Sequence, residues 1–172
     1  MKPIIVLAAL IVALLLQTTV AGLSLDAGSL VNVVLIAVVY IALSMGALTG
    51  LLAGAAGGLA QDAIAGSIVG IGGLSKTLVG FLVGVLGAQF IVSQPIPRFV
   101  MFVGATFLHE LCFQGLHSLV EGQAFQFGYR SVLTQAALNA VIGILAFQLV
   151  ESAPGMMQRR EARSSVFGRR RF

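Results

Sequence analysis

The chain has 172 residues, of which 58% are hydrophobic and only 9% are charged. Since a soluble domain carries about 25% charged residues, this composition excludes a soluble globular domain, and at about 20 residues per crossing the length allows five or six transmembrane helices. The formal net charge of +4 comes largely from arginines near the C-terminus, without interleaved aromatic residues, and therefore indicates anionic lipid rather than nucleic acid as the partner.

The first half of the chain predicts three helices, which cover residues 3–20, 30–44 and 46–65. The N-terminal apolar run is interpreted as an uncleaved helix rather than a secretory signal, because no clear A-x-A site follows it. Residues 30–65 are too many for one crossing at about 1.5 Å per residue, so we expect a tight turn near Ser44–Gly46. The loop before this pair is expected at residues 22–29.

The second half predicts three more helices, which cover residues 76–92, 98–120 and 129–150. The glycine-rich segment 66–75 is interpreted as a loop that is apolar enough to enter the bilayer or fold over the bundle. Pro95 and Pro97 predict a break between helices, and residues 121–128 a further loop. Pro154 and Gly155 are expected to end the last helix.

Six spans place both termini on one side of the membrane, and the arginine-rich tail makes that side cytoplasmic by the positive-inside rule. We therefore expect a bundle at residues 1–152 and a basic cytoplasmic tail at residues 153–172, with five spans as the alternative. The tail is expected to contact anionic lipid or a cytoplasmic partner, and it could equally act only as a topology anchor. Its arginines are Arg159, Arg160, Arg163, Arg169, Arg170 and Arg171.

Glycines recur every four residues in the third predicted helix, at Gly46, Gly50, Gly54 and Gly58. In lipid, small residues at this spacing form a groove where a second helix can come close. Gly80 and Gly84 offer a second face of the same kind. The spacing leaves open whether the partner helix belongs to this chain or to another protein.

Four charges are expected within the outer half of the bundle, at Asp62, Lys76, Glu110 and Arg130. Each alone would cost about 2.5–3.5 kcal/mol at a helix centre, so pairing is expected. The hypothesis is that Asp62 pairs with Lys76 and Glu110 with Arg130. These pairs would act as structural pins; an ion or substrate path is the functional alternative.

Glu110, Gln114 and His117 share one face of the fifth predicted helix, because they are spaced by four and three residues. This polar stripe could line a small cavity or face another protein's transmembrane helix. A zinc protease motif is excluded, because Phe113 stands where H-E-x-x-H requires the second histidine. No nucleotide-binding or hydrolase motif appears, and neither an enzymatic activity nor a cofactor is expected.

Residues 46–87 resemble the bacterial rod shape-determining protein MreD family. The resemblance rests on G-L-A-Q-D at residues 58–62, the glycine-rich segment 66–73 and K-T-L-V-G-F-L-V-G at residues 76–84. The family shows a similar G-L-x-x-D, a glycine-rich loop and K-x-x-V-G-[YF]-x-x-G. The length and the number of spans agree over nearly the whole chain.

This resemblance implies a non-enzymatic scaffold of the inner membrane, in the elongasome that maintains rod shape. Its implied partners are MreC and, through MreC, MreB filaments, RodA and a class B penicillin-binding protein that directs lateral peptidoglycan synthesis. No catalytic residues are known for the family, so none are carried over.

Two other functions remain open at this stage. A substrate-binding subunit similar to the S-components of energy-coupling-factor vitamin importers would also have six helices and a similar size. Its cavity would use Glu110, Gln114, His117 and Arg130. A small channel or proton-coupled carrier would instead need an unpaired acid on a water path.

Overall fold

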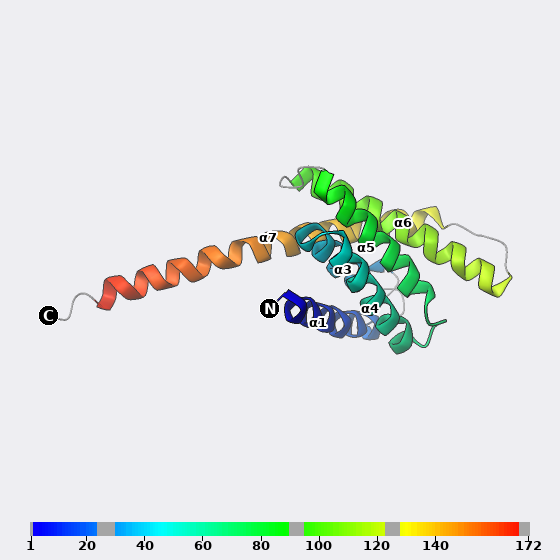
Figure 1. The fold of residues 1–172 in the computed structure, drawn as a ribbon, viewed down its shortest axis with the longest axis horizontal. Coiled ribbons are helices and arrows are strands. Elements are labelled where there is room, and N and C mark those ends of the chain that lie inside the picture. The colour runs from blue at the N-terminus through cyan, green and yellow to red at the C-terminus, as the bar shows by residue number, and fades with distance from the viewer. Residues whose placement is uncertain (1, 24–29, 90–94, 123–127, 169–172) are drawn as a thin grey trace.

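The computed structural model describes residues 2–23, 30–89, 95–122 and 128–168, and the side chains of all of these except Lys2, Leu23, Pro95 and residues 151–168. The described residues form six α-helices and no strand, so the expectation of an all-α bundle is confirmed (Figure 1). The helices are α1 (Lys2–Leu23), α3 (Val33–Met45), α4 (Ala47–Ala65), α5 (Ile71–Gln89), α6 (Pro95–Glu121) and α7 (Tyr129–Gly168).

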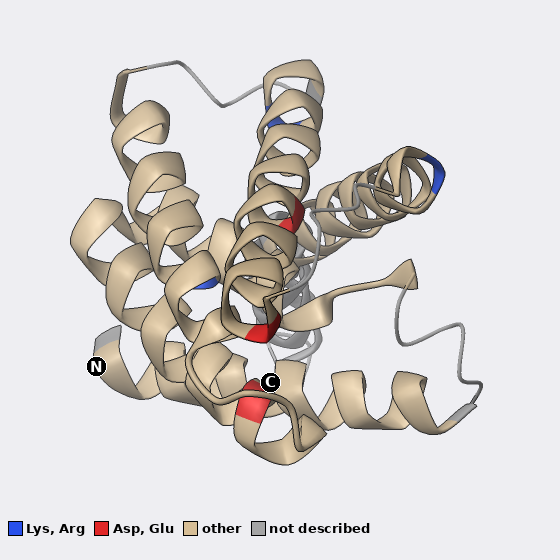
Figure 2. Cartoon of the chain, turned by 90° about the vertical axis from the view of Figure 1, so that its right-hand side faces the viewer, with Lys and Arg blue, Asp and Glu red and all other residues tan. Residues whose placement is uncertain are grey.

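Four helices are long and apolar enough to cross a membrane, namely α1, α5, α6 and α7. The helix α3 is apolar but has only 13 residues. The helix α4 has 19 residues, and its glycines together with Gln61 and Asp62 make it less hydrophobic than α3. Charged residues are sparse along the ribbon (Figure 2), as expected for a protein that lipid surrounds.

The short helix α3 lies at the centre of the bundle. It contacts α1, α4, α5, α6 and α7, and Val34, Leu35, Val38 and Val39 on it are at most 1% exposed. The helix α1 buries mainly Leu10 and Ala13, so most of its apolar surface faces outward. The N-terminus lies toward the end of the bundle where α7 leaves it (Figure 1).

The expected turn between α3 and α4 is present, and it is made by Gly46 alone. The φ angle of Gly46 is 92° and its ψ is 177°, a conformation that is essentially restricted to glycine. The Gly46 amide donates to the carbonyl of Ala42, and its carbonyl accepts from Gly50, so hydrogen bonding continues across the turn.

The predicted loop at residues 66–75 is wrong in its second half, because α5 begins at Ile71 rather than at Lys76. Gly66 and Gly70, with φ of 66° and 113°, do form the turn. Gly72 and Gly73 are helical, since the first turn of α5 packs on α4 and receives a cap from it, as described below. Packing here overrides the low helix propensity of glycine.

The break predicted from Pro95 and Pro97 is confirmed, since α5 and α6 are separate helices, but the expected helix start at Arg98 and the expected helix end at Pro154 and Gly155 are wrong. The helix α6 begins at Pro95 and includes Pro97, because a first helical turn needs none of the N–H groups that proline lacks. The helix α7 continues past Pro154 and Gly155 to Gly168. An interior proline removes one hydrogen bond, and water can satisfy the freed carbonyl where α7 extends beyond the other helices (Figure 1).

Part of the predicted tail lies outside the described residues. This holds for Arg169, Arg170 and Arg171, and for the side chains of Arg159, Arg160 and Arg163. Most of the predicted loops at residues 22–29 and 121–128 also lie outside the described residues. The boundary between bundle and tail at residue 152 stays a prediction.

Candidate functional site: a close helix pair and a buried polar network

The helices α4 and α5 form the most extensive contact of the bundle, and glycines line it from both sides. A Cβ at Gly54 would lie within 3.0 Å of backbone atoms of Lys76 and Thr77, and a Cβ at Gly58 would do so against Gly72 and Gly73. The glycine ladder of α4 therefore faces a helix of the same chain, where backbone meets backbone.

The contact has a regular antiparallel register. Gly50 faces Gly80, because a Cβ on either residue would meet the other's carbonyl oxygen. Gly84 lies against the backbone of Ala47 and Gly46. A Cβ at Gly46 would meet open space, so a glycine is needed at this position for the turn and not for the helix contact.

Asp62 closes the far end of this contact by capping α5. Its Oδ2 accepts hydrogen bonds from the amides of Gly70, at 2.9 Å, and Gly73, at 3.1 Å. A Cβ at Gly72 would collide with its Oδ1, so glycine there lets the carboxylate approach. A carboxylate at a helix N-terminus is stabilised by the free N–H groups and by the helix dipole.

Neither expected ion pair forms within 4.0 Å among the described residues. Lys76 is 2% exposed and interacts electrostatically with both Asp62 and Glu110. Asp62 instead accepts hydrogen bonds from backbone amides, because its carboxylate lies beside the start of α5, where these amides are free. Arg130 is exposed at the start of α7 and leaves Glu110 to other partners.

Glu110 accepts a hydrogen bond from Nε2 of Gln114 at 3.2 Å. Its Oε1 lies 3.9 Å from Nε2 of His109, and the Glu110 side chain is 14% exposed. Lys76, Asp62 and Glu110 thus lie near one another where α4, α5 and α6 meet, and the imidazole of His109 adjoins Glu110.

A chain of uncharged polar side chains continues from His109. Asn32 Nδ2 lies 3.3 Å from His109 Nε2, and its backbone amide donates to Oδ1 of Asn139 at 3.0 Å. Asn139 donates in turn to the hydroxyl of Thr106 at 3.3 Å. Asn32 also caps α3 by accepting from Leu35. This network therefore joins the start of α3 to α6 and α7.

The network leaves two polar atoms without a partner among the described residues, namely His109 Nδ1 and Gln114 Oε1. His109 is 2% exposed, Thr106 1% and Asn139 0%. The sequence analysis missed Asn32 and Thr106 altogether. The one signal for them is that polar residues stand within long apolar runs, where they tend to face the bundle interior.

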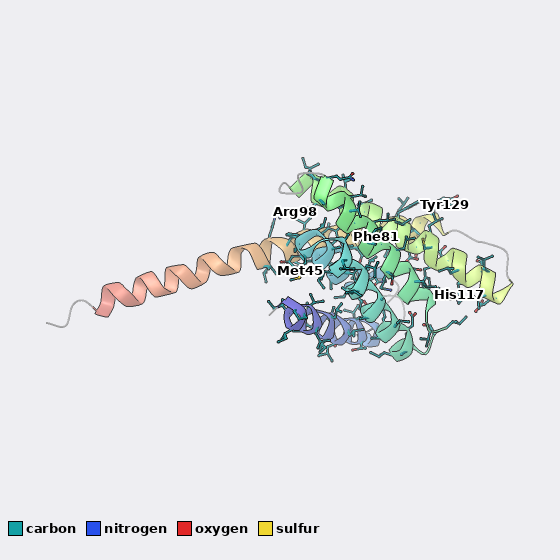
Figure 3. All side chains as sticks on the ribbon, viewed as in Figure 1. Met45, Phe81, Arg98, His117 and Tyr129 are labelled. Carbon is teal, nitrogen blue, oxygen red and sulfur yellow. The ribbon has the colours of Figure 1, made fainter. Side chains whose placement is uncertain are left out.

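The rest of the polar stripe is less buried. The side chain of His117 is 43% exposed and pairs with Glu121 at 3.0 Å, one turn further along α6. His117 lies near the end of α6 opposite to Arg98 (Figure 3). Arg98 is 9% exposed, with its guanidinium 4.2 Å from the centre of the Phe147 ring.

These side chains can hold the helices in register, and they are not arranged as a catalytic group. Among the residues that the structure describes, no three His, Cys, Asp or Glu side chains are grouped so that they could hold a metal ion. Asp62 and Asn32 act as helix caps, and Asn139 with Thr106 as interhelical hydrogen-bonding groups. Fold and site together define a helical membrane protein with a structural polar interior.

A comparison with protein families shows which family the chain resembles. The model of the family described as rod shape-determining protein MreD matches residues 1–152, and the chain belongs to this family. Its role therefore lies in the determination of rod shape. No curated protein and no solved structure matches the chain, so the likeness to S-components stays an expectation.

Proposed function

We propose that this protein is a non-enzymatic scaffold of the cell-elongation machinery, which binds an MreC-like membrane protein. Through that partner it would help MreB, RodA and a class B penicillin-binding protein direct peptidoglycan synthesis along the cell wall. Membership of the MreD family supports the role in rod shape, and the scaffold mechanism is our inference from the interior of the bundle.

The observation that carries the scaffold function is how the intramembrane acid is used. Asp62 lies 4% exposed with its Oδ2 on two backbone amides, and the glycine ladder is covered by α5. An acid held as a helix cap is poorly suited to carry ions or substrate. A bundle fixed in this way suits a platform on which other membrane proteins assemble.

We also propose that the protein resides in the inner membrane with both termini in the cytoplasm. The structure supports this topology, because Met45 and Arg98 lie near the end where α7 leaves the bundle, and His117 and Tyr129 near the other (Figure 3). The arginines of the tail would then meet anionic headgroups, each worth about 1 kcal/mol near the surface.

Depletion of the protein from rod-shaped cells tests the function. We expect the cells to round up, and a fluorescent wall precursor to lose its incorporation along the cell sides while the division site stays labelled. Restoration by the wild-type chain is the control. Rod-shaped cells with normal lateral labelling after complete depletion would contradict the proposal.

A further inference from the structure

A cleft of about 460 Å³ lies between the second half of α1 and the end of α4. Gln17, Thr18 and Ala21 line it from α1, and Gln61 and Ala65 from α4. The helices α1 and α4 touch where Gly57 faces Leu10, at 3.0 Å from its would-be Cβ, and the cleft lies beyond that contact. In the topology proposed above, it is at the outer end of the bundle.

The carboxamide of Gln61 is the uncommitted polar group of this cleft. Its Oε1 is buried and has no hydrogen-bond partner among the described residues. The other polar groups are engaged. Gln17 accepts from the amide of Val33 at 2.7 Å and donates to the carbonyl of Val31, and the Thr18 hydroxyl donates to the carbonyl of Leu15.

The chemistry of the cleft selects its occupant. Lipid tails offer no hydrogen-bond donor or acceptor to an amide, and a phosphate headgroup needs a cation, whereas none of the described residues that line the cleft is charged. A neutral polar side chain fits, because a rotated carboxamide can present either its oxygen or its NH₂ group. Ala21 and Ala65 leave room for a helix backbone to come close.

We propose that this cleft docks a transmembrane helix of a partner membrane protein, which sets a Ser, Thr, Asn or Gln side chain against Gln61. The proposal rests on the scaffold function and adds the surface and the chemistry of the partner. Small residues of that helix would lie against Ala21 and Ala65.

Thr18 and Thr19 provide a matched pair for the test. Both are exposed on α1 and both hydroxyls donate to the carbonyl of Leu15, at 2.9 and 2.8 Å, but only Thr18 lines the cleft. A photo-crosslinking amino acid is placed at either position of the full chain in living cells. We expect position 18, and not position 19, to crosslink to the transmembrane segment of the MreC-like protein, identified by mass spectrometry.

A second measurement uses substitutions and the amount of that protein recovered with the tagged chain. Thr18→Trp should fill the cleft and abolish recovery, whereas Thr19→Trp should leave it unchanged. Gln61→Leu should lower the affinity roughly 3- to 15-fold, the range for one interhelical hydrogen bond in a membrane.

Crosslinks from position 18 only to phospholipid, only to a small molecule or to a second copy of this chain would overturn the docking proposal. Equal crosslinking at positions 18 and 19, or equal recovery with both Trp variants, would do so as well. The wild-type chain separates the two levels of the account. If it still recovers the MreC-like protein, only the cleft assignment fails; if it recovers none, the scaffold function fails too.

Discussion

At the scale of single residues, Asp62 is the clearest case of a membrane-embedded charge with an assigned partner. Its carboxylate satisfies two amides at the start of α5, and Lys76 lies near enough to interact electrostatically. The cap, more than a direct salt bridge, therefore accounts for the acid at this position.

Asp62→Asn should keep much of the stability, since an amide oxygen can still accept from Gly70 and Gly73, whereas Asp62→Leu should lose about 1–3 kcal/mol of unfolding free energy. Unfolding in detergent, followed by circular dichroism, measures both. The double variant Asp62→Lys with Lys76→Asp should not recover the wild-type value, because lysine cannot accept these hydrogen bonds. Full recovery by that swap would show that a simple charge pair, not a cap, stabilises the site.

Asn139 is fully buried and bonds both to the amide of Asn32 and to Thr106. Asn139→Leu should lower the unfolding free energy by about 1–3 kcal/mol, because both groups lose a partner inside the bundle. Leu138→Ala, on the neighbouring and more exposed position, is the control and should cost less. The same detergent titration compares them, and an equal loss in both variants would argue against a structural network.

The sequence alone identified Asp62, Lys76 and Glu110 as intramembrane charges, because a charge in an apolar run is conspicuous. It did not predict the partner of Asp62, since backbone amides are present at every position and only the fold shows which ones are free. It paired Arg130 with Glu110, although Arg130 is exposed at the start of α7 and forms no such ion pair. The link from Asn32 to His109 depends on helix rotation, which a short polar side chain does not reveal.

At the scale of helices, the glycine ladder sets how close α4 and α5 lie. Gly54→Ala should reduce the unfolding free energy by about 1–3 kcal/mol, because its methyl group would press on the backbone of Lys76. Gly104→Ala is the matched control on α6, where a Cβ meets nothing within 4 Å, and it should be neutral or slightly stabilising. Unfolding titrations of both variants that gave the same result would contradict close packing at Gly54.

The turn between α3 and α4 depends on one backbone conformation. Gly46→Ala should destabilise the protein by about 1–3 kcal/mol although its side chain has free space, because the φ of 92° is strained for an L-residue. Gly115→Ala, in open space without a positive φ, is the control for this thermal or detergent unfolding assay. A wild-type stability of Gly46→Ala would mean that the turn can relax.

Most helices could be predicted from apolar runs, and the turn at Gly46 from the length of the run alone. The start of α5 could not, because Gly70, Gly72 and Gly73 favour a loop by propensity. What makes two of them helical is the contact with Asp62 and α4, which lies outside any local window of sequence. The extension of α7 past Pro154 was also missed, because proline disfavours a helix interior by propensity and was therefore taken to end the helix.

At the scale of the whole molecule, a central α3, a tight α4–α5 pair and a loosely covered α1 form a bundle whose polar groups mostly face one another. The outer surface of this bundle is largely apolar. Membership of the MreD family gives the whole molecule a role in the determination of rod shape.

The central claim is best tested by purifying the tagged full-length protein from native membranes in a mild detergent and identifying what comes with it by mass spectrometry. The account predicts recovery of an MreC-like protein with wall-synthesis proteins. Recovery of an ATPase pair with a coupling membrane subunit, and of no wall-synthesis protein, would contradict it.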